Sequence, residues 1–258
     1  MSFLLVQDIH HTYFTKTSAT TALSDISLQV EEGEFVSFLG PSGCGKTTLL
    51  SIIANLIKPT QGTVILENEA VSTSKNKIGY MLQQDYLFPW KTIEENILLG
   101  LKLSKQLNSK TKANALNLLN QIGLSGVEKQ LPKQLSGGMR QRVALVRTLT
   151  TEPKLLMLDE PFSALDYQIK LKLEDLVSGT LKNYGKTAIL VTHDISEAIA
   201  MSDRVFLFSP SPGKLHRTFV MPEELRRLSP FEARNHEAFS SIFQTIWKEL
   251  ESLESRKQ

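Results

Sequence analysis

The stretch EFVSFLGPSGCGKTTLLSIIANLI, residues 34–57, decides the fold of this chain. It opens with a compact apolar run that predicts a buried strand. A glycine-rich loop, GPSGCGKTT, follows at residues 40–48, and the apolar residues after it recur with helical spacing. Strand, glycine loop and helix in this order are the context in which such a loop binds phosphate. The stretch therefore predicts a nucleotide site between a strand and a helix.

The loop has the spacing of a phosphate loop, set by Gly40, Gly45, Lys46 and Thr47. Its glycines let backbone N–H groups wrap the phosphates, the lysine neutralises β/γ charge, and the threonine hydroxyl reaches Mg²⁺. A chance glycine turn is the alternative, which the flanking strand and helix disfavour. We expect the whole loop to bind the nucleotide: Gly40, Pro41, Ser42, Gly43, Cys44, Gly45, Lys46, Thr47 and Thr48.

A second run, LLMLDEP at residues 155–161, predicts a buried strand that ends in two acids. Asp159 is placed to hold Mg²⁺ through water, and Glu160 is placed to orient or deprotonate an attacking water. The alternative is a solvated acidic turn. A phosphate loop upstream in the same chain favours the catalytic interpretation.

Three further candidates are ambiguous on their own. His193 ends the strand-like run ILVTHD, where ligands gather in open α/β sheets, and it can touch a γ-phosphate or be structural. Gln83 carries a carboxamide that can ligate Mg²⁺ or position water. Tyr13 can stack on an adenine face or pack between strand and loop. We interpret the remaining histidines as structural: His10, His11, His216 and His236.

The segment QLPKQLSGGMRQRVALVRTL, residues 130–149, poses a separate question. Ser136-Gly137-Gly138 is a bare turn before a long run of good helix formers. Free backbone N–H groups and a positive dipole end at such a helix start suit an anion. The chain therefore carries a second candidate phosphate turn.

The order of patterns along the chain predicts an α/β fold. Short alternating runs open the chain, a mostly helical insert follows at about residues 92–149, and strands then alternate with helices, which implies a mostly parallel core sheet. Ser229-Pro230-Phe231-Glu232 is a capping box that starts a helical end. We expect a nucleotide-binding domain over residues 1–222 and a C-terminal helical tail over residues 223–258.

Composition limits the functions that remain. Lysine and arginine number 29 against 27 acids, a net charge of +2, so nothing demands nucleic acid as a partner. The single cysteine, Cys44, forms no intrachain disulfide. The first residues do not resemble a signal peptide, and no apolar run approaches the roughly 18 residues that cross a bilayer. We expect a cytoplasmic protein that reaches a membrane only through a partner.

From Tyr13 through Asp203-Arg204 these patterns resemble the ATP-binding subunits of ABC transporters. LSGGMRQRVAL is similar to that family's signature motif, and SALD, residues 163–166, looks like the loop that crosses its dimer interface. The resemblance implies a P-loop ATPase with an N-terminal antiparallel β subdomain, ATP and Mg²⁺ as cofactors, and ATP hydrolysis. The resemblance also assigns roles. It implies that Tyr13 stacks on adenine and that Mg²⁺ is bound by Gln83, Asp159 and Thr47. It implies as well that the catalytic residues are Glu160, His193 and Lys46.

The resemblance also answers why one chain needs two phosphate turns. Members of this family act as head-to-tail dimers, so Ser136 and Gly138 would bind the ATP held by the phosphate loop of a second copy. Half-sites on opposite faces of one protein close naturally through a two-fold axis. The second turn thus implies self-association.

Within the family the chain resembles importers of the nitrate, sulfonate, taurine and thiamine-precursor type, on the segments QQDYLFPWKTIEENILLGL and SPGKL. This implies membrane permease subunits and an external substrate-binding protein as partners, with the chain held at the cytoplasmic side of the membrane. The aromatic turn Phe88-Pro89-Trp90 either grips a permease helix or packs inside the insert. The transported compound cannot be read from this chain.

Two other classes remain as alternatives. A soluble ABC ATPase of DNA repair, translation or iron–sulfur assembly usually shows coiled-coil insertions or tandem cassettes, which are not visible here. A P-loop kinase of small molecules would leave LSGGMRQR without a role. Both fit the sequence less well than an energy-coupling subunit.

Overall fold

The computed structural model describes residues 2–73, 77–163, 165–183 and 185–255. The chain divides into two compact units, one formed by Met1–Lys75 with Ser178–Gln258 and the other by Asn76–Val177. Ala164, within the SALD segment, and residues 256–258 of the expected tail lie outside the described residues. Helix α6 (Tyr167–Asn183) contains the boundary between the units.

The first unit opens with an antiparallel sheet in the order β2-β1-β4-β5. Its strands are β1 (Leu4–Phe14), β2 (Ala19–Val30), β4 (Gln61–Leu66) and β5 (Glu69–Ala70). Short alternating runs predicted strands here, and the antiparallel N-terminal sheet is confirmed. Along β2 the residues from Ile26 to Val30 alternate between buried and exposed, as expected for a sheet with one face in a core.

A second set of strands in this unit is mostly parallel, in the order β10-β9-β3-β8. It consists of β3 (Phe35–Leu39), β8 (Thr187–Thr192), β9 (Arg204–Phe208) and β10 (Leu215–Val220). Strand β3 pairs parallel with both β8 and β9, while β10 pairs antiparallel with β9. Every residue of β3 is buried, which explains why four of its five residues are apolar. The sequence patterns did not predict β10, because this largely exposed strand mixes polar and apolar residues.

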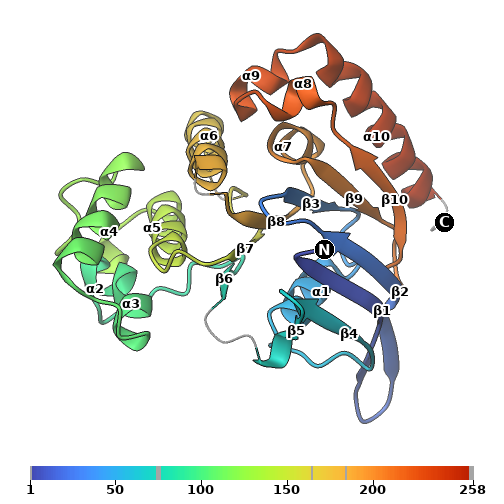
Figure 1. Cartoon of the computed structure of the whole chain (residues 1–258), viewed down its shortest axis with the longest axis horizontal. Helices are drawn as coiled ribbons and strands as arrows, with labels where there is room; N and C mark the ends of the chain where they lie inside the picture. The colour runs from blue at the N-terminus through green and yellow to red at the C-terminus, as the bar shows by residue number, and fades with distance from the viewer. Residues whose placement is uncertain (1, 74–76, 164, 184, 256–258) are drawn as a thin grey trace. The chain divides into compact units, whose positions relative to one another are not determined.

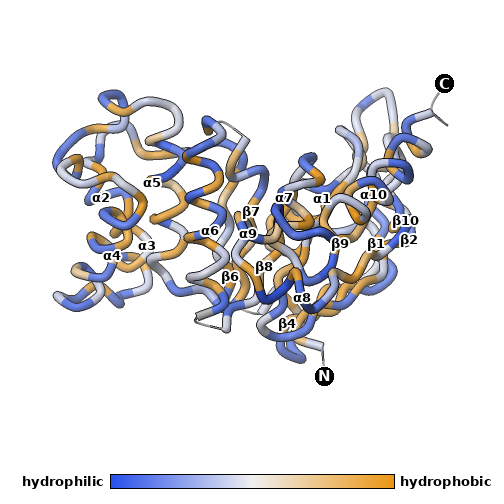
Figure 2. The backbone as a smooth tube through the Cα atoms, turned by 90° about the horizontal axis from the view of Figure 1, so that it is seen from above, coloured by the Kyte–Doolittle hydropathy of each residue, from blue (hydrophilic) through white to orange (hydrophobic). Residues whose placement is uncertain are grey.

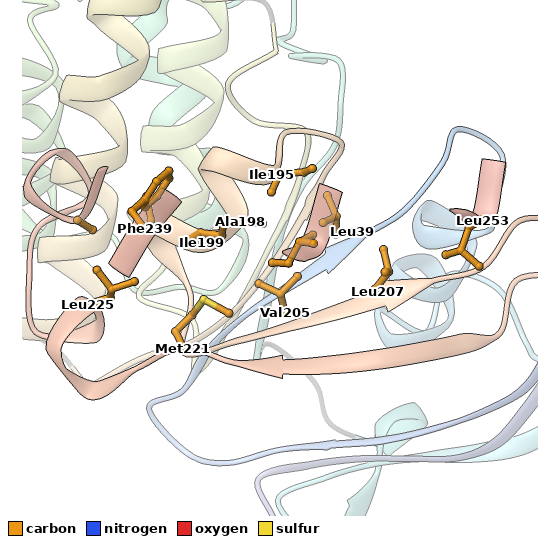
Figure 3. Packing of buried hydrophobic residues seen from close by; sticks show 13 residues of the cluster. Leu39, Ile195, Ala198, Ile199, Val205, Leu207, Met221, Leu225, Phe239 and Leu253 are labelled. Carbon is orange, nitrogen blue, oxygen red and sulfur yellow. The ribbon is translucent and has the colours of Figure 1, made fainter. Parts of the chain in front are cut away.

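The helices of the first unit are α1 (Lys46–Ile53), η1 (Val71–Thr73), α7 (Ile195–Met201), α8 (Glu223–Arg226), α9 (Pro230–Arg234) and α10 (Glu237–Ser255). Helix α7 packs on β3, and α9 and α10 pack on α7 (Figure 1). The buried face of α10 meets α7, β9 and β3 in one hydrophobic cluster that includes Leu39, Ile199, Leu207, Ile246 and Leu253 (Figure 3). The C-terminal helices therefore share the core of this unit.

The predicted capping box is present at the start of α9. Ser229 Oγ accepts a hydrogen bond from the backbone N–H of Glu232, whose side chain in turn accepts from the Ser229 N–H. Helix α9 ends at Arg234, however, and the long C-terminal helix α10 starts separately at Glu237. The boundary between nucleotide-binding domain and tail stays a prediction.

The second unit combines a strand pair with helices. Strands β6 (Ile78–Met81) and β7 (Leu155–Asp159) pair in parallel, and the helices are α2 (Ile93–Ile97), α3 (Leu99–Leu103), α4 (Ser109–Gln121), η2 (Pro132–Gln134) and α5 (Gly137–Leu149). Helix α5 packs against α2, α3, α4 and β6. Hydrophobic and hydrophilic stretches alternate along these helices in Figure 2, as expected for helices with one face in a core. The helical character predicted for residues 92–149 is confirmed, whereas four-residue β6 was missed.

No helix within the described ranges is both long enough and apolar enough to cross a bilayer.

Candidate functional site

The candidate residues are divided between the two units. The first unit carries the glycine-rich loop, Tyr13 and His193, and the second carries Gln83, Asp159, Glu160 and the Ser136 turn.

The glycine-rich loop joins β3 to α1, the context that the sequence predicted. Gly45 is the N-cap of α1 and has φ +92°, a left-handed conformation that side chains other than glycine rarely adopt. An added Cβ there would also lie 2.6 Å from Leu23 Cδ2. Gly45 offers no side chain that could cap α1, and the first turn of the helix contains no acid, so its N-terminal N–H groups favour an anion.

Lys46 places its ammonium group inside the loop. The side chain is only 6% exposed, and Nζ donates to the carbonyl oxygens of Gly40 at 2.7 Å and Pro41 at 3.1 Å. Cys44 beside it is fully buried, and this burial raises the pKa of its thiol. The loop thus combines one cation, backbone N–H groups and no acid, a donor set that fits a polyphosphate.

Residues 209–214 lie against the glycine-rich loop, and the sequence patterns gave this segment no structural role. Ser211 Oγ donates to the Gly43 carbonyl at 3.0 Å. The Gly213 N–H donates to Ala22 O at 2.9 Å, and the Ser24 N–H donates to Gly213 O at 3.0 Å. Gly213 approaches the loop so closely that a Cβ there would lie 1.9 Å from the Cys44 carbonyl oxygen. Residues 209–214 therefore hold the phosphate loop against the start of β2.

Tyr13 lies near the start of α1. Its ring is 42% exposed, and its hydroxyl shares a hydrogen bond of 3.2 Å with Thr48 Oγ1. An exposed aromatic face tied to the first turn of α1 is suited to a flat ligand group beside the phosphate loop. The structure thus brings Tyr13 and Thr48 together, and the stacking of Tyr13 on adenine stays a prediction.

His193 directly follows β8 and is exposed. The turn that presents it is fixed by its neighbours: the Asp194 N–H donates to Thr192 Oγ1 at 3.0 Å, and Asp194 caps α7 by accepting from Ser196 N at 2.8 Å. This arrangement presents an imidazole at the carboxyl end of a parallel strand, where ligands of α/β sheets gather.

In the second unit the two acids predicted from LLMLDEP occupy different environments. Asp159 ends buried β7, is 2% exposed, and accepts a long hydrogen bond of 3.5 Å from the Tyr80 hydroxyl. Glu160 follows with φ +48°, an uncommon conformation for a residue with a side chain. Strained backbone of this kind clusters at functional sites.

Gln83 and Glu160 lie together, although they are far apart in sequence. Gln83 Nε2 donates to Glu160 Oε2 at 3.3 Å, so the carboxamide is beside the candidate base. Gln83 and Asp159 of this unit carry a carboxamide and a carboxylate, which are oxygen ligands that suit Mg²⁺, and Thr47 of the first unit carries a hydroxyl that suits it as well. This ion needs few protein ligands when phosphates supply the rest. The chemistry of this donor set fits Mg²⁺.

Ser136 is the N-cap of α5, and its side chain accepts from the Met139 N–H at 3.3 Å. The first turn of α5 contains no acid, which keeps this helix start suitable for an anion. The sequence predicted Gly137 and Gly138 in a turn before the helix, but both lie in the first turn of α5 itself.

Helix α5 is also tied to the segment that follows Gln83, a connection that sequence reasoning missed. Arg140 Nε forms an ion pair with Asp85 Oδ2 at 2.9 Å, and Arg147 donates to the carbonyl oxygens of Asp85 and Tyr86 at 2.7 and 2.8 Å. The arginines of MRQRVALVR were the available signal, but their partners lie more than 50 residues away.

The two aromatic residues of the turn Phe88-Pro89-Trp90 differ in burial, so each fits one of the two interpretations offered by the sequence. Phe88 is partly buried and its N–H donates to Asn96 Oδ1 at 2.8 Å, whereas Trp90 is 72% exposed and meets Phe88 edge to face. A groove of about 280 Å³ lies beside it, with Tyr80, Phe88, Leu103 and Arg147 among its lining residues. An exposed aromatic next to a groove is suited to contact with another protein.

Comparison with known proteins identifies the family. The family model described as ABC transporter matches residues 23–163. The chain is 61% identical to the uncharacterized ABC transporter ATP-binding protein YtlC of Bacillus subtilis (strain 168), over 100% of this chain and 99% of that protein. The chain belongs to the ABC transporter family. Its ATP-binding subunits hydrolyse ATP, so the chain is an ATPase, and the resemblance found in the sequence is confirmed.

Further relatives of this ABC protein are import subunits. It is 39% identical to the aliphatic sulfonates import ATP-binding protein SsuB of Bacillus cereus, over 93% of this chain and 92% of that one. It is 40% identical to the taurine import ATP-binding protein TauB of Pelagibacter ubique, over 86% of this chain and 84% of that one.

A solved structure agrees with the fold. The dimeric post-hydrolysis state of the ATP-binding cassette MJ0796, bound to ADP and Pi, is 32% identical, with a TM-score of 0.77 over 85% of this chain and 99% of that one. The expected P-loop ATPase fold of the ABC type is thereby confirmed.

Proposed function

We propose that this ABC ATPase is the energy-coupling subunit of an importer for small organic sulfonates or taurine. The observation that carries the proposal is the identity of about two fifths with SsuB and TauB, which are named for aliphatic sulfonates and for taurine, over most of each chain. Nitrate and thiamine-precursor-like compounds remain predictions from sequence resemblance. Selection among these compounds belongs to a permease and an external substrate-binding protein.

The nucleotide is bound by two copies of the chain in this proposal. The phosphate loop of one copy, with Lys46 and Thr47, holds the phosphates, and Tyr13 stacks on the adenine. Ser136 and Gly138 of the second copy close over the same ATP. The acid-free N-terminus of α5 and the dimeric state of MJ0796 with ADP and Pi support this arrangement.

Hydrolysis needs a base beside the γ-phosphate. Glu160 takes a proton from the attacking water, Gln83 holds Glu160 in place through their hydrogen bond, and His193 contacts the γ-phosphate. Thr47, Gln83 and Asp159 would hold Mg²⁺, which would neutralise charge on the phosphates. Loss of the γ-phosphate removes the contact that holds two copies together, so binding and hydrolysis alternate between closed and open dimers.

The groove beside Phe88 and Trp90 receives the permease. Its apolar lining, the exposed ring of Trp90 and the guanidinium of Arg147 suit an amphipathic helix of the partner. Docking there holds the chain at the cytoplasmic side of the membrane. The hydrogen bonds from α5 to residues 83–86 give the permease site a physical connection to both Gln83 and the Ser136 turn.

The mass of the Glu160→Gln variant in solution tests the shared site. This substitution removes the base but keeps the phosphate cradle, so MgATP should convert a monomer into a dimer, and MgADP should not. Ser136→Arg in the same background is the matched control, since it blocks the second half of the site and should abolish the dimer. A mass that ignores MgATP would overturn the two-copy arrangement.

Uptake of labelled taurine or methanesulfonate tests the transport assignment. Cells that carry the native chain should accumulate one of these compounds, and cells that carry Glu160→Gln should not. Equal uptake by both strains would remove this chain from sulfonate import and leave its ATPase activity untouched.

A further inference from the structure

His11 occupies the transition between the hydrophobic core and the nucleotide site. Residues 9, 11 and 13 project from the same face of β1, and their exposure rises from 0% at Ile9 through 7% at His11 to 42% at Tyr13. The ring of His11 is therefore the last buried side chain before the exposed aromatic.

The His11 ring contacts Tyr13 directly. The two ring centroids lie 4.5 Å apart with an interplanar angle of 86°, an edge-to-face pair. Neither His11 Nδ1 nor His11 Nε2 has a hydrogen-bond partner among the described residues, although both atoms are buried. The described contact of this ring with Tyr13 is therefore aromatic and not hydrogen-bonded.

The strand pairing changes register on both sides of His11. Ile9 pairs with Ile26, His11 with Leu23, and Thr12 with Thr21, so β2 gains an extra residue twice within this short stretch. Bulges of this kind re-aim side chains next to functional sites.

The residue opposite His11 packs against the phosphate loop. An added Cβ at Gly45 would lie 2.6 Å from Leu23 Cδ2, which places Leu23 in close contact with the loop. On the other side, the Tyr13 hydroxyl reaches Thr48 in the first turn of α1. Tyr13 is thus held at two points, because its hydroxyl bonds to Thr48 and its ring contacts the ring of His11.

We propose that His11 is a positioning residue that sets the tilt of the Tyr13 ring and thereby the affinity for the nucleotide base. The imidazole acts as a flat aromatic plate and needs neither nitrogen for this role. This inference rests on the proposed stacking of Tyr13 on adenine. It revises the interpretation of His11 as purely structural.

The test compares a ligand that has a base with one that lacks it. The dissociation constants of MgADP and of magnesium pyrophosphate are measured by calorimetry on the full chain, because neither ligand contains the γ-phosphate that is hydrolysed. His11→Leu keeps most of the volume but removes the ring, and His11→Phe restores a ring without nitrogens. His10→Ala, on the opposite face of the same strand, controls for general disturbance of the hairpin.

In His11→Leu the ratio of the ADP to the pyrophosphate dissociation constant should rise about two- to ten-fold, the range an edge-to-face pair contributes. His11→Phe should return the ratio to within about two-fold of the native value, and His10→Ala should leave it unchanged. An equal loss of affinity for both ligands in His11→Leu, or failure of His11→Phe to restore the ratio, would overturn the inference.

Tyr13→Ala separates this inference from the proposed function. If Tyr13→Ala raises the ratio and His11→Leu does not, the stacking of Tyr13 stands and the role of His11 fails. If Tyr13→Ala leaves the ratio unchanged, the proposed stacking fails and the role of His11 fails with it.

Discussion

Gly213→Ala should disable the phosphate loop without a change in any residue of that loop. A Cβ at position 213 would lie 1.9 Å from the Cys44 carbonyl oxygen, whereas real Cβ contacts are essentially never shorter than 3.0 Å. One of the two segments must therefore move by at least 1.1 Å, the difference between 3.0 and 1.9 Å. The obstacle is backbone, which cannot turn away as a flexible side chain can. The Cys44 carbonyl belongs to the phosphate loop, so the displacement changes the backbone that is expected to bind phosphate.

The expected magnitude follows from this displacement. Misplacement of about 1 Å at a site costs on the order of 100-fold in function, and we expect the affinity for MgADP to fall on that scale. Calorimetry on the full chain measures the affinity, and urea denaturation measures the accompanying loss of stability. Gly179→Ala is the matched control, because it makes the same substitution where the added Cβ meets no atom of the described residues within 4 Å.

A folded Gly213→Ala protein with native affinity for MgADP would show that residues 209–214 do not support the loop. Ser211→Ala offers an intermediate case, because it removes only the hydrogen bond to the Gly43 carbonyl. It should weaken binding by less than about ten-fold, in line with one net hydrogen bond of about 1 kcal/mol.

Three other predictions concern stability and the signature turn. Ile246→Ala should lower the free energy of unfolding by about 3 kcal/mol, because it removes three buried carbon groups and leaves a cavity. The control Gln244→Ala changes an exposed residue of the same helix and should cost under about 0.5 kcal/mol. Equal, small losses for both variants in urea denaturation would show that α10 is not part of the core. Burial raises the pKa of Asp203 above its ordinary 3.8, so the free energy of unfolding of the native protein should fall as pH rises through the raised value. Asp203→Asn can still accept from the Phe35 N–H, and its stability relative to the native protein should increase over that pH range. A stability difference between the two proteins that does not change with pH would contradict the assignment. Ser136→Ala should destabilise α5 by about 1 kcal/mol, because it removes the side chain that caps this helix. It should also lower ATP turnover and leave the affinity of the monomer for MgADP unchanged. A loss of that affinity as large as the loss of turnover would contradict a shared site.

The sequence by itself determined the features that depend on local pattern. The strand, glycine loop and helix of residues 34–57 were predicted and are present, because each part is encoded within a few neighbouring residues. The capping box at Ser229 and the buried strand ending at Asp159 were predicted for the same reason. Family membership also followed from short motifs.

Only the tertiary structure decided the contacts between distant segments. The approach of Gly213 to Cys44, the bond between Gln83 and Glu160, and the edge-to-face pair behind Tyr13 have no local signal. Strands β6 and β10 were missed for a related reason: a short or exposed strand is stabilised by its partner, and the partner lies elsewhere in the chain. Local chemistry predicts which residues bind the nucleotide, whereas long-range packing determines how those residues are held.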